Sequence, residues 1–411
     1  MKTASIITIG NEILAGKTVD TNAAYLAVEL QNISIPVIST YTVADEIKAI
    51  IRVLNLAGED ANVIVVTGGL GPTDDDLTRQ AFAEFLGVEL QFQKDLLENI
   101  RQLFAQRNLD MPEKNKIQAY IPAGAKALKN IGTAPGILAE YKGKIFVALP
   151  GVPKEMEQML QESVLPKLKE FAGGQAVVVR RLKCFGAGES TIAEMIGDMM
   201  QRGRNPLINC TASDGIITLH IIATSKEQKE ARTMAEKDEK LLRDILGELV
   251  YGVGEQTLAE VVGEKLSRQK KTIAVAESCT GGWLAKLITD VPGASGYFTY
   301  GWFTYSNEAK INELGVPADL IEKHGAVSEQ VAEVMARGAR RKAGTDFAIG
   351  ITGIAGPTGG TEQKPVGLAY ISVDSQSGCE TKCCHFISKR ELTRHRAAQT
   401  ALNMLRLKLN I

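Results

Sequence analysis

The sequence predicts an α/β protein made of two three-layer α/β domains joined by a small α+β module. The first and last thirds of the chain each alternate short, continuously apolar runs with amphipathic helical patterns, which is typical of largely parallel sheets covered by helices on both faces. The segment between them has the order strand, helix, strand, strand, helix. A length of 411 residues allows two to four domains at roughly 150 residues each.

The elements of the first domain follow from its apolar runs. Predicted strands cover Ser5–Ile9, Ile35–Val43, Asn62–Thr67 and Lys144–Leu149. Predicted helices cover Thr21–Leu30, Glu46–Leu56, Leu77–Leu86 and Lys154–Phe171, and the segment Ala81–Ala125 is expected to be mostly helical. A glycine-rich loop spans Ile131–Gly136, and Gly173–Gly174 form a linker that sets the first domain at residues 1–172.

The middle module covers residues 175–252 and the last domain residues 255–411. In the module, strands are predicted at Ala176–Phe185, Leu207–Thr211 and Ile216–Ala223, with helices at Ser190–Met200 and Glu227–Leu246. In the last domain, a helix begins at Leu258, because apolar residues recur at helical spacing from there to Leu266. Strands Thr272–Ala276, Phe347–Thr352 and Leu368–Val373 and helices Trp283–Asp290, Ser328–Lys342 and Lys389–Leu407 complete this domain.

Composition and charge exclude several classes of protein. Lys and Arg total 47 and Asp and Glu total 48, a net charge of −1, so the chain lacks the basic excess of a nucleic-acid binder. No stretch approaches the roughly 18 uncharged apolar residues of a membrane span, and the N-terminus lacks the pattern of a signal peptide. Six cysteines without a CxxC pair favour neither a disulfide framework nor a zinc site. We therefore expect a cytoplasmic protein with no membrane association and no direct nucleic-acid contact.

A glycine-rich segment, Thr67–Asp76, lies between a predicted strand and a predicted helix. Glycines such as Gly69 and Gly71 let the backbone approach a ligand closely, and the helix N-terminus offers N–H groups to an anion. The segment lacks the GK[ST] of a P-loop and the third glycine of a dinucleotide fingerprint. It is therefore a candidate phosphate site of another kind.

The acids Asp74, Asp75 and Asp76 in this segment leave two interpretations open. Each would repel a phosphate by about 4 kcal/mol at an effective dielectric constant near 20, and a divalent cation between them reverses that sign. The sharper hypothesis is a metal-bridged phosphoryl or pyrophosphate ligand, and the alternative is that the acids cap the helix. Gly10–Glu12, Asp20–Asn22 and Leu149–Pro153 also follow strands and should reach the same carboxyl edge of the sheet.

These motifs resemble the molybdopterin-binding-type domain of the CinA family of competence/damage-inducible proteins. The matching pieces are GNEIL, DTNA, TGGLGPTDDDLT, NIGTAPG and LPGVPKEM, across most of residues 1–165. In the family this domain resembles molybdenum-cofactor proteins in fold and is associated with metal-dependent ADP-ribose pyrophosphatase activity. The resemblance implies a divalent metal (Mg²⁺, Mn²⁺ or Co²⁺), with Asp74, Asp75, Asp76, Glu12 and Asp20 as candidate ligands and with Gly69 and Gly71 near the substrate.

The middle module resembles a small KH-type domain. KH domains clamp nucleic acid with a GXXG loop, and this segment has none, since Gly203 stands alone between Arg202 and Arg204. We interpret the two arginines as a solvated surface and the module as a structural spacer, because a fold-level analogy is weak support for function.

In the last domain, Ser278 lies at a strand-to-helix junction in the sequence ESCTGG. A serine there points its hydroxyl above the sheet edge, and the N–H groups that follow can form an oxyanion hole at the helix start. A histidine base for Ser278 is not indicated, because neither His324 nor His385 has an acidic partner at a suitable spacing. Lys310, in a tyrosine-rich apolar segment, is a candidate base, because burial lowers a lysine pKa.

Two further segments should reach the same edge. Thr352 and Gly353 open a glycine-rich loop after a strand, and Arg390 and Arg394 lie one helical turn apart near Ser388. Arginines at the start of a helix are suited to gripping a phosphate.

These residues resemble the nicotinamide mononucleotide deamidase domain, which is the other half of the CinA family. The matching motifs are ESCTGG, TYSNEAK, HGAVSE, GITGIAGPTGG and KPVG, in order over about 150 residues. The family reaction converts nicotinamide mononucleotide and water into nicotinate mononucleotide and ammonia. The resemblance further implies a homodimer, and no cofactor for this half.

The roles that the resemblance implies are specific. Ser278 would be the nucleophile and Lys310 the general base, Tyr305 would orient or relay a proton, and Thr352 would assist. Gly281, Gly282 and Gly353 would lie near the substrate. Arg390 would bind its phosphate, but Lys389 stands where the family often has an acid, so Arg394 shares that assignment.

Other interpretations stay open at this stage. Ser278 could be only a helix cap and Lys310 only a surface lysine, and Cys279 is a rival nucleophile. Adjacent side chains in a turn point apart, so only one of Ser278 and Cys279 can face the substrate. Cys383–Cys384 is interpreted as strand filler, since no third ligand is suitably spaced. The N-terminal domain could bind molybdopterin or be inactive, and the chain could be a non-catalytic interaction protein linked to competence or DNA damage.

Overall fold

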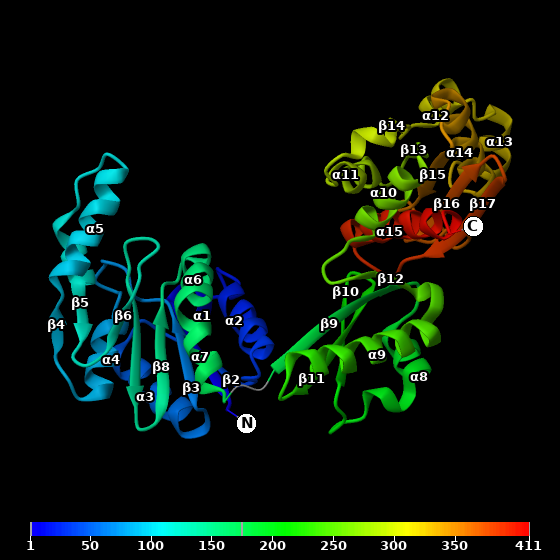
Figure 1. The fold of residues 1–411 in the computed structure, drawn as a ribbon. Coiled ribbons are helices and arrows are strands. Elements are labelled where there is room, and N and C mark those ends of the chain that lie inside the picture. The colour runs from blue at the N-terminus through cyan, green and yellow to red at the C-terminus, as the bar shows by residue number, and fades with distance from the viewer. Residues whose placement is uncertain (1, 174–175, 411) are drawn as a thin grey trace. The chain divides into compact units, whose positions relative to one another are not determined.

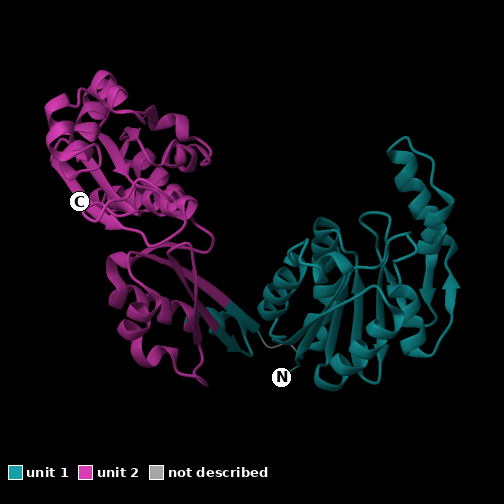
Figure 2. Ribbon diagram, turned by 180° about the vertical axis from the view of Figure 1, so that it is seen from behind, with its two compact units in different colours: residues 1–178, 223–233 teal, residues 179–222, 234–411 magenta. Residues whose placement is uncertain are grey.

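The computed structural model describes residues 2–173 and 176–410. These residues form two compact units, one of residues 1–178 with 223–233 and the other of residues 179–222 with 234–411 (Figure 2). Half of the predicted linker Gly173–Gly174, and the first residue of the predicted middle module, lie outside the described residues.

The first unit contains a six-stranded sheet with the order β2-β1-β3-β8-β7-β6 (Figure 1). Strands β2, β1, β3 and β8 are parallel, and β7 and β6 pair antiparallel. The bounds are β1 Ala4–Ile9, β2 Val37–Val43, β3 Val63–Thr67, β6 Lys126–Leu128, β7 Gly136–Tyr141 and β8 Lys144–Leu149. The central strands are buried on both faces, as their continuously apolar sequences predict.

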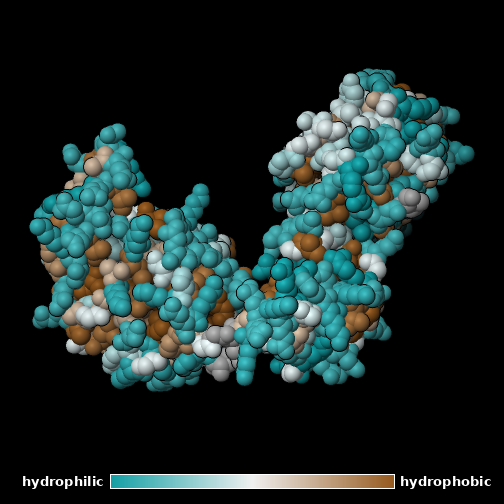
Figure 3. Space-filling view, viewed as in Figure 1, coloured by the Kyte–Doolittle hydropathy of each residue, from teal (hydrophilic) through white to brown (hydrophobic). Residues whose placement is uncertain are grey.

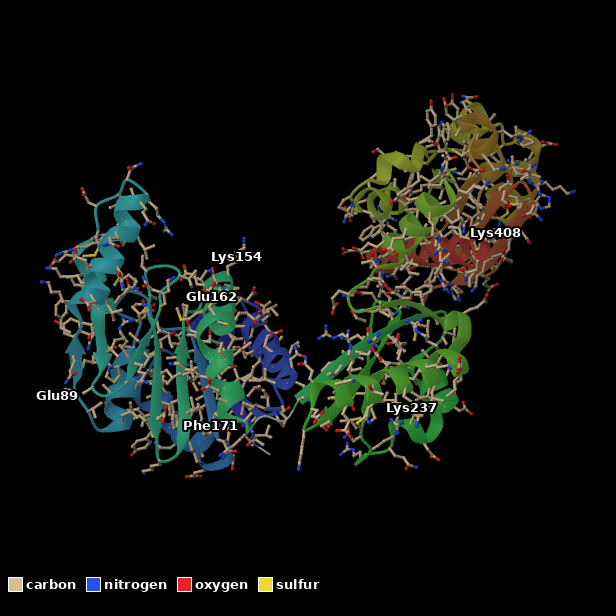
Figure 4. The ribbon with its side chains drawn as sticks, in the orientation of Figure 1. Glu89, Lys154, Glu162, Phe171, Lys237 and Lys408 are labelled. Atoms are coloured by element: carbon tan, nitrogen blue, oxygen red, sulfur yellow. The ribbon has the colours of Figure 1, made fainter. Side chains whose placement is uncertain are left out.

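Helices cover both faces of this sheet and give the expected three layers. The helices are α1 Asn11–Leu14, α2 Thr21–Asn32, α3 Ile47–Asp60, α4 Thr78–Leu86, α6 Pro153–Met159, the π-helical turn Leu160–Val164 and α7 Leu165–Phe171. One apolar core joins α2, α6 and α7 to the sheet, and a second joins α3 and α4 to the opposite face. Figure 4 shows Lys154 and Phe171 at opposite ends of the α6–α7 stretch, which was predicted as one helix.

The segment Ala81–Ala125 is less helical than the sequence predicts. After α4, helix α5 (Lys94–Gln106) and a 3-10 helix (Glu113–Ala119) alternate with strands β4 (Leu90–Phe92) and β5 (Tyr120–Pro122), which pair as a separate two-stranded sheet. Strands of three residues are too short to show a period of two, which is why the sequence pattern missed them.

The middle module has the predicted order with one additional strand. Its antiparallel sheet has the order β10-β11-β9-β12. The elements are β9 Ala176–Phe185, α8 Glu189–Ile196, 3-10 helix Gly197–Met200, β10 Leu207–Ser213, β11 Ile216–Ser225, α9 Gln228–Leu246, 3-10 helix Gly247–Leu249 and β12 Val250–Val253. Arg202 is exposed, but Arg204 forms an ion pair with the buried Asp238, so the interpretation of Arg204 as solvated surface is wrong.

The last domain is a second three-layer structure. Its sheet has the order β14-β13-β15-β16-β17, in which the first three strands are parallel and the last two are antiparallel. The strands are β13 Ile273–Glu277, β14 Phe298–Phe303, β15 Phe347–Gly353, β16 Leu368–Ser375 and β17 Gly378–His385. The predicted strands match β13, β15 and β16, whereas the edge strands β14 and β17 were not predicted.

Its helices are divided between the two faces of the sheet. They are α10 Leu258–Gln269, α11 Trp283–Thr289, 3-10 helix Ala294–Gly296, α12 Asn307–Leu314, α13 Ala318–His324, α14 Glu329–Ala343 and α15 Arg390–Lys408. One core contains α10, α11 and α15, and the opposite core contains α12, α13 and α14. Phe185 and Tyr251 of the middle module belong to the first of these cores, and the buried Arg406 of α15 donates to the carbonyl oxygens of Glu248 and Val250.

Among the described residues, no helix combines the length and the apolar character needed to span a bilayer. On the face drawn in Figure 3, hydrophilic residues cover most of each unit, with apolar residues between them.

Candidate functional site

Ser278 lies in a tight turn between β13 and α11. Its N–H donates to the carbonyl oxygen of Ile351 at 3.0 Å, and the N–H of Gly281 donates to the Ser278 carbonyl at 3.1 Å. Gly281 and Gly282 have φ angles of 56° and 91°, which is a left-handed backbone that favours glycine. The turn thus holds Ser278, which is 8% exposed, against the carboxyl end of β15.

The last residue of β13 is a buried carboxylate that the sequence analysis missed. Glu277 accepts hydrogen bonds from the N–H groups of Gly282 (3.0 Å), Leu284 (3.1 Å) and Ala285 (2.8 Å). The first N–H groups of a helix have no partner within the helix and carry partial positive charge, so the carboxylate both satisfies and neutralises the start of α11. Glu277 could have been found as an acid directly before the predicted nucleophile Ser278, at the end of an apolar strand.

This carboxylate also changes the expected oxyanion hole. Three N–H groups at the helix start, which were candidates for it, are bonded to Glu277. The N–H groups of Cys279 and Thr280 make no hydrogen bond to another residue in the described part of the chain. These two amides are therefore the donors that the turn leaves for a developing negative charge.

Lys310 reaches Ser278 from α12. The lysine is 1% exposed, and its Nζ lies 3.1 Å from Ser278 Oγ. Nζ also donates to the carbonyl oxygens of Thr304 at 2.8 Å and Tyr305 at 3.2 Å, with that of Ser306 farther away at 3.5 Å. A neutral amine has two N–H bonds and one lone pair. Two N–H bonds directed to the nearer carbonyls leave the lone pair for the serine proton.

Burial acts on both Lys310 and Cys279, in opposite directions. It lowers the pKa of the Lys310 amine below its ordinary value, because the interior solvates the ammonium form poorly. It raises the pKa of the Cys279 thiol to about 11, and this side chain packs in the core with α10, α11 and α15. A protonated thiol in an apolar core is a poor nucleophile.

Two predicted helpers are near the dyad without bonding to it through their hydroxyls. Tyr305 is 66% exposed, and its hydroxyl accepts a hydrogen bond from Arg390 at 3.4 Å. The buried Thr352 hydroxyl donates to the carbonyl oxygen of Ala326 at 2.8 Å. Gly353 is pressed against β16, since a Cβ there would lie 2.7 Å from the carbonyl oxygen of Leu368, so strand packing alone requires this glycine.

The two predicted arginines hold loops around the serine. Arg390 donates to the carbonyl oxygen of Gly356 at 2.7 Å. Arg394 donates to the Thr280 carbonyl through Nε (3.1 Å) and Nη2 (2.6 Å), and its guanidinium lies over the ring of Trp283. Ser388 bonds to the hydroxyl of Thr393. Arg394 therefore lies against the turn of residues 278–282 that carries the predicted nucleophile (the nucleophile turn), and Arg390 against the glycine-rich loop that follows β15.

In the first unit, the glycine-rich segment is a loop held by its own side chains. Asp76 accepts hydrogen bonds from the N–H groups of Gly71 (2.8 Å) and Thr73 (2.9 Å). A Cβ on Gly71 would lie 2.4 Å from the Asp76 carboxylate, and one on Gly69 would lie 2.3 Å from the Thr78 hydroxyl. No side chain caps α4, so the alternative in which the acids cap this helix is wrong.

The other predicted metal ligands are spread along the edge. Asp74 is exposed, 3.9 Å from Lys114, and Asp75 is exposed as well. Asp20 caps α2 and accepts a hydrogen bond from Thr8, and Glu12 is exposed on α1. Within residues 2–173 and 176–410, no group of three or more His, Cys, Asp or Glu side chains is arranged to hold a metal ion. The residues as placed do not form a metal site, and the metal stays a prediction.

Two polar residues at this edge were not among the candidates. Asp45 follows β2; burial raises its pKa, and the nearby charges of Glu12 and Asp75 raise it further. Asn22 donates to the Thr67 hydroxyl and to the Gly151 carbonyl, whereas its buried Oδ1 has no partner among the described residues. Asp45 could have been found by the same rule as the others, since it comes directly after a predicted strand.

A buried arginine, Arg79, holds the backbone of the glycine-rich segment Thr67–Asp76. Arg79 donates to the carbonyl oxygens of Leu70 (2.6 Å) and Gly71 (2.7 Å), and burial lowers its pKa to about 10. These bonds fix the backbone on which the glycines lie.

Comparisons with known proteins agree with this domain order. Residues 5–170 match the family model described as "Probable molybdopterin binding domain", residues 179–252 match "Damage-inducible protein CinA KH domain", and residues 255–409 match "CinA C-terminal domain".

Relatives match over the full chain. A Caldicellulosiruptor bescii protein whose name describes it as competence-damage inducible is 41% identical over 99% of both chains. A CinA-like protein of Kosmotoga olearia is 41% identical over 98% of both chains. The crystal structure of a CinA protein of unknown function from Thermoplasma acidophilum covers 41% of this chain and 98% of its own, with 37% identity and a TM-score of 0.38. The chain therefore belongs to the CinA family, with a molybdopterin-binding-like domain, a KH module and a CinA C-terminal domain in that order.

Proposed function

We propose that the C-terminal domain is a metal-independent amidohydrolase that converts nicotinamide mononucleotide and water into nicotinate mononucleotide and ammonia. The observation that carries this proposal is the buried contact of 3.1 Å between Lys310 Nζ and Ser278 Oγ. A nucleophile within hydrogen-bond distance of a base with a lowered pKa is the arrangement that covalent catalysis needs. The substrate is the one that the motif resemblance implies.

The proposed reaction assigns one role to each of these groups. Lys310 accepts the Ser278 proton while Oγ attacks the carboxamide carbon, and the carbonyl electron pair moves onto oxygen. In this proposal the N–H groups of Cys279 and Thr280, which make no hydrogen bond to another residue among those described, donate to that oxygen. The intermediate expels ammonia, which takes the proton from Lys310. Water then attacks the ester with Lys310 again as base, and nicotinate mononucleotide leaves as Ser278 Oγ regains a proton from Lys310.

Ammonia release from nicotinamide mononucleotide tests this proposal, with and without a chelator. Ser278→Ala and Lys310→Ala should each lower the rate by at least about a hundredfold, and Cys279→Ala should keep most of it. The reverse pattern, in which the cysteine variant is dead and the serine variant works, would overturn the assignment. Arg390→Ala and Arg394→Ala should raise KM if these residues bind the phosphate, and light scattering tests the homodimer.

For the N-terminal domain we propose hydrolysis of ADP-ribose with a divalent metal. The support is the motif resemblance, together with Asp45 near the glycine-rich loop, whose pKa is raised by burial and by the nearby charges of Glu12 and Asp75, and with the buried Oδ1 of Asn22, which has no partner among the described residues. Release of AMP from ADP-ribose with Mg²⁺, Mn²⁺ or Co²⁺, and its loss in Asp45→Asn, are expected. Absence of AMP with all three metals would favour the rival interpretation, a molybdopterin-binding or inactive domain.

A non-catalytic interaction protein is the remaining rival. Binding to DNA that weakens steeply with salt, without ammonia release, would support it.

A further inference from the structure

Two exposed aromatic side chains flank the segment that holds Lys310. Phe303 is 58% exposed and Tyr305 is 66% exposed, whereas Thr304 between them is buried. The carbonyl oxygen of Thr304 accepts the shortest hydrogen bond of Lys310 Nζ. Both rings are therefore exposed at the surface, next to the residue whose carbonyl oxygen holds the amine of Lys310.

Phe303 also lies on the nucleophile turn. Its ring is 3.3 Å from the position that a Cβ on Gly282 would occupy, and the guanidinium of Arg394 is 3.2 Å from the equivalent position on Gly281. The aromatic ring of Phe303 therefore packs against Gly282, and the guanidinium of Arg394 packs against the adjacent Gly281. Any larger side chain at either position would displace one of these neighbours, in addition to the strain of a positive φ.

An aromatic ring beside a guanidinium fits a ligand with a cationic ring at one end and a phosphate at the other. The carboxamide of nicotinamide mononucleotide is attached to a pyridinium ring with a positive charge, and cations are attracted to the face of an aromatic ring. The carboxylate of the turn does not compete for this role, because Glu277 is buried and accepts three backbone N–H groups. The Phe303 ring is thus an exposed, electron-rich surface beside the turn.

We propose that Phe303 is a specificity-determining residue whose ring binds the charged pyridinium ring of the substrate and distinguishes it from uncharged nicotinamides. This inference rests on the proposed deamidase function. It assigns to Phe303 a contact that a leucine of similar size could make with an apolar ring, but not with a cationic one at the same strength.

The test compares two inhibitors that share the carboxamide and differ in charge, 1-methylnicotinamide and nicotinamide. Their inhibition constants are measured against nicotinamide mononucleotide hydrolysis by the full-length protein, by Phe303→Leu and by Tyr300→Leu. Tyr300 is a matched control, because it is 56% exposed on the same strand and stacks on Trp302. Phe303→Leu should reduce the preference for the cation by about three- to thirtyfold, Tyr300→Leu should not change it, and Phe303→Trp should keep it.

The outcomes separate this inference from the function on which it rests. If the unmodified protein releases ammonia and Phe303→Leu keeps the full preference for the cation, the role of Phe303 is refuted and the deamidase proposal stands. An equal loss in Tyr300→Leu also refutes it, because the effect would then be general to the strand. If the unmodified protein releases no ammonia from nicotinamide mononucleotide, the deamidase proposal fails first and takes this inference with it.

Discussion

Replacing Glu277 with glutamine should destabilise the C-terminal domain and loosen the turn that carries Ser278. The carboxylate accepts two N–H groups through Oε2 and one through Oε1. A glutamine keeps one oxygen, so at least one buried N–H faces an NH₂ group, at about 1–3 kcal/mol. Loss of the negative charge at the start of α11 adds about 0.3–1 kcal/mol. The free energy of unfolding should fall by about 1–4 kcal/mol, which corresponds to roughly 3–15 °C in Tm.

Tryptophan fluorescence during thermal unfolding measures this change in one domain. The sequence contains two tryptophans, Trp283 and Trp302, and both lie in the C-terminal domain. Glu308→Gln is the control for loss of a negative charge at a helix start, because Glu308 is exposed in the first turn of α12 and makes only the contribution of about 0.3–1 kcal/mol expected there. Equal unfolding temperatures for the two variants would refute the idea that Glu277 anchors the turn.

The remaining predictions concern titration, packing and metal. The rate of ammonia release should decrease as the pH is lowered through the pKa of Lys310, which burial lowers, because only the neutral amine accepts the serine proton. A rate that does not change from about pH 5 to 9 would contradict a lysine base. Gly263→Ala should cost about 1–3 kcal/mol, since its Cβ would lie 2.5 Å from the buried Tyr297 hydroxyl. Tyr297→Phe should cost little, as that hydroxyl has no partner among the described residues, and should recover part of the loss in the double variant, measured by urea unfolding. A chelator should leave ammonia release unchanged.

The lysine titration has a second consequence, for stability. The pKa of Lys310 is lower in the folded protein than in the unfolded chain, where it is near 10.5. Between the two values the unfolded chain binds more protons, so the free energy of unfolding rises with pH in that range. Below the pKa of Lys310 in the folded protein, the amine is protonated in both states, and the free energy of unfolding is reduced by the full cost of burying the charged amine.

The strands buried on both faces are those for which the sequence gives the clearest signal. Strands such as Val63–Thr67 and Ile273–Glu277 are continuously apolar because helices cover both sides of the sheet. The edge strands β14 and β17 carry mostly partly or fully exposed side chains, so neither shows an apolar run. Their pairing depends on a neighbouring strand, which no local pattern records.

The sequence predicted which residue types belong to the candidate site. It could not predict which of them contact one another, because these contacts depend on the fold. The sequence indicated Ser278 and Lys310 separately, but their contact spans 32 residues and depends on β13 and β14 being adjacent and parallel. The acids of the N-terminal loop show the opposite case. The pattern suggested shared ligands, whereas Asp76 is engaged by its own loop and Asp20 by its own helix.

Desolvation explains why the turn would use a serine although a cysteine is its neighbour. A thiol at position 279 belongs to the apolar core, and burial raises its pKa to about 11, which removes the advantage that a thiolate has over a hydroxyl. Burial of an amine has the opposite sign: it lowers the pKa of Lys310, so that a larger fraction of the amine is neutral and able to accept a proton. One low-dielectric environment therefore disables the residue that is more reactive in water and activates the pair that includes the less reactive one. For this reason the identity of the two residues alone could not decide whether Ser278 or Cys279 is the better candidate nucleophile. The choice depends on which side chain is buried in the apolar core and which contacts Lys310.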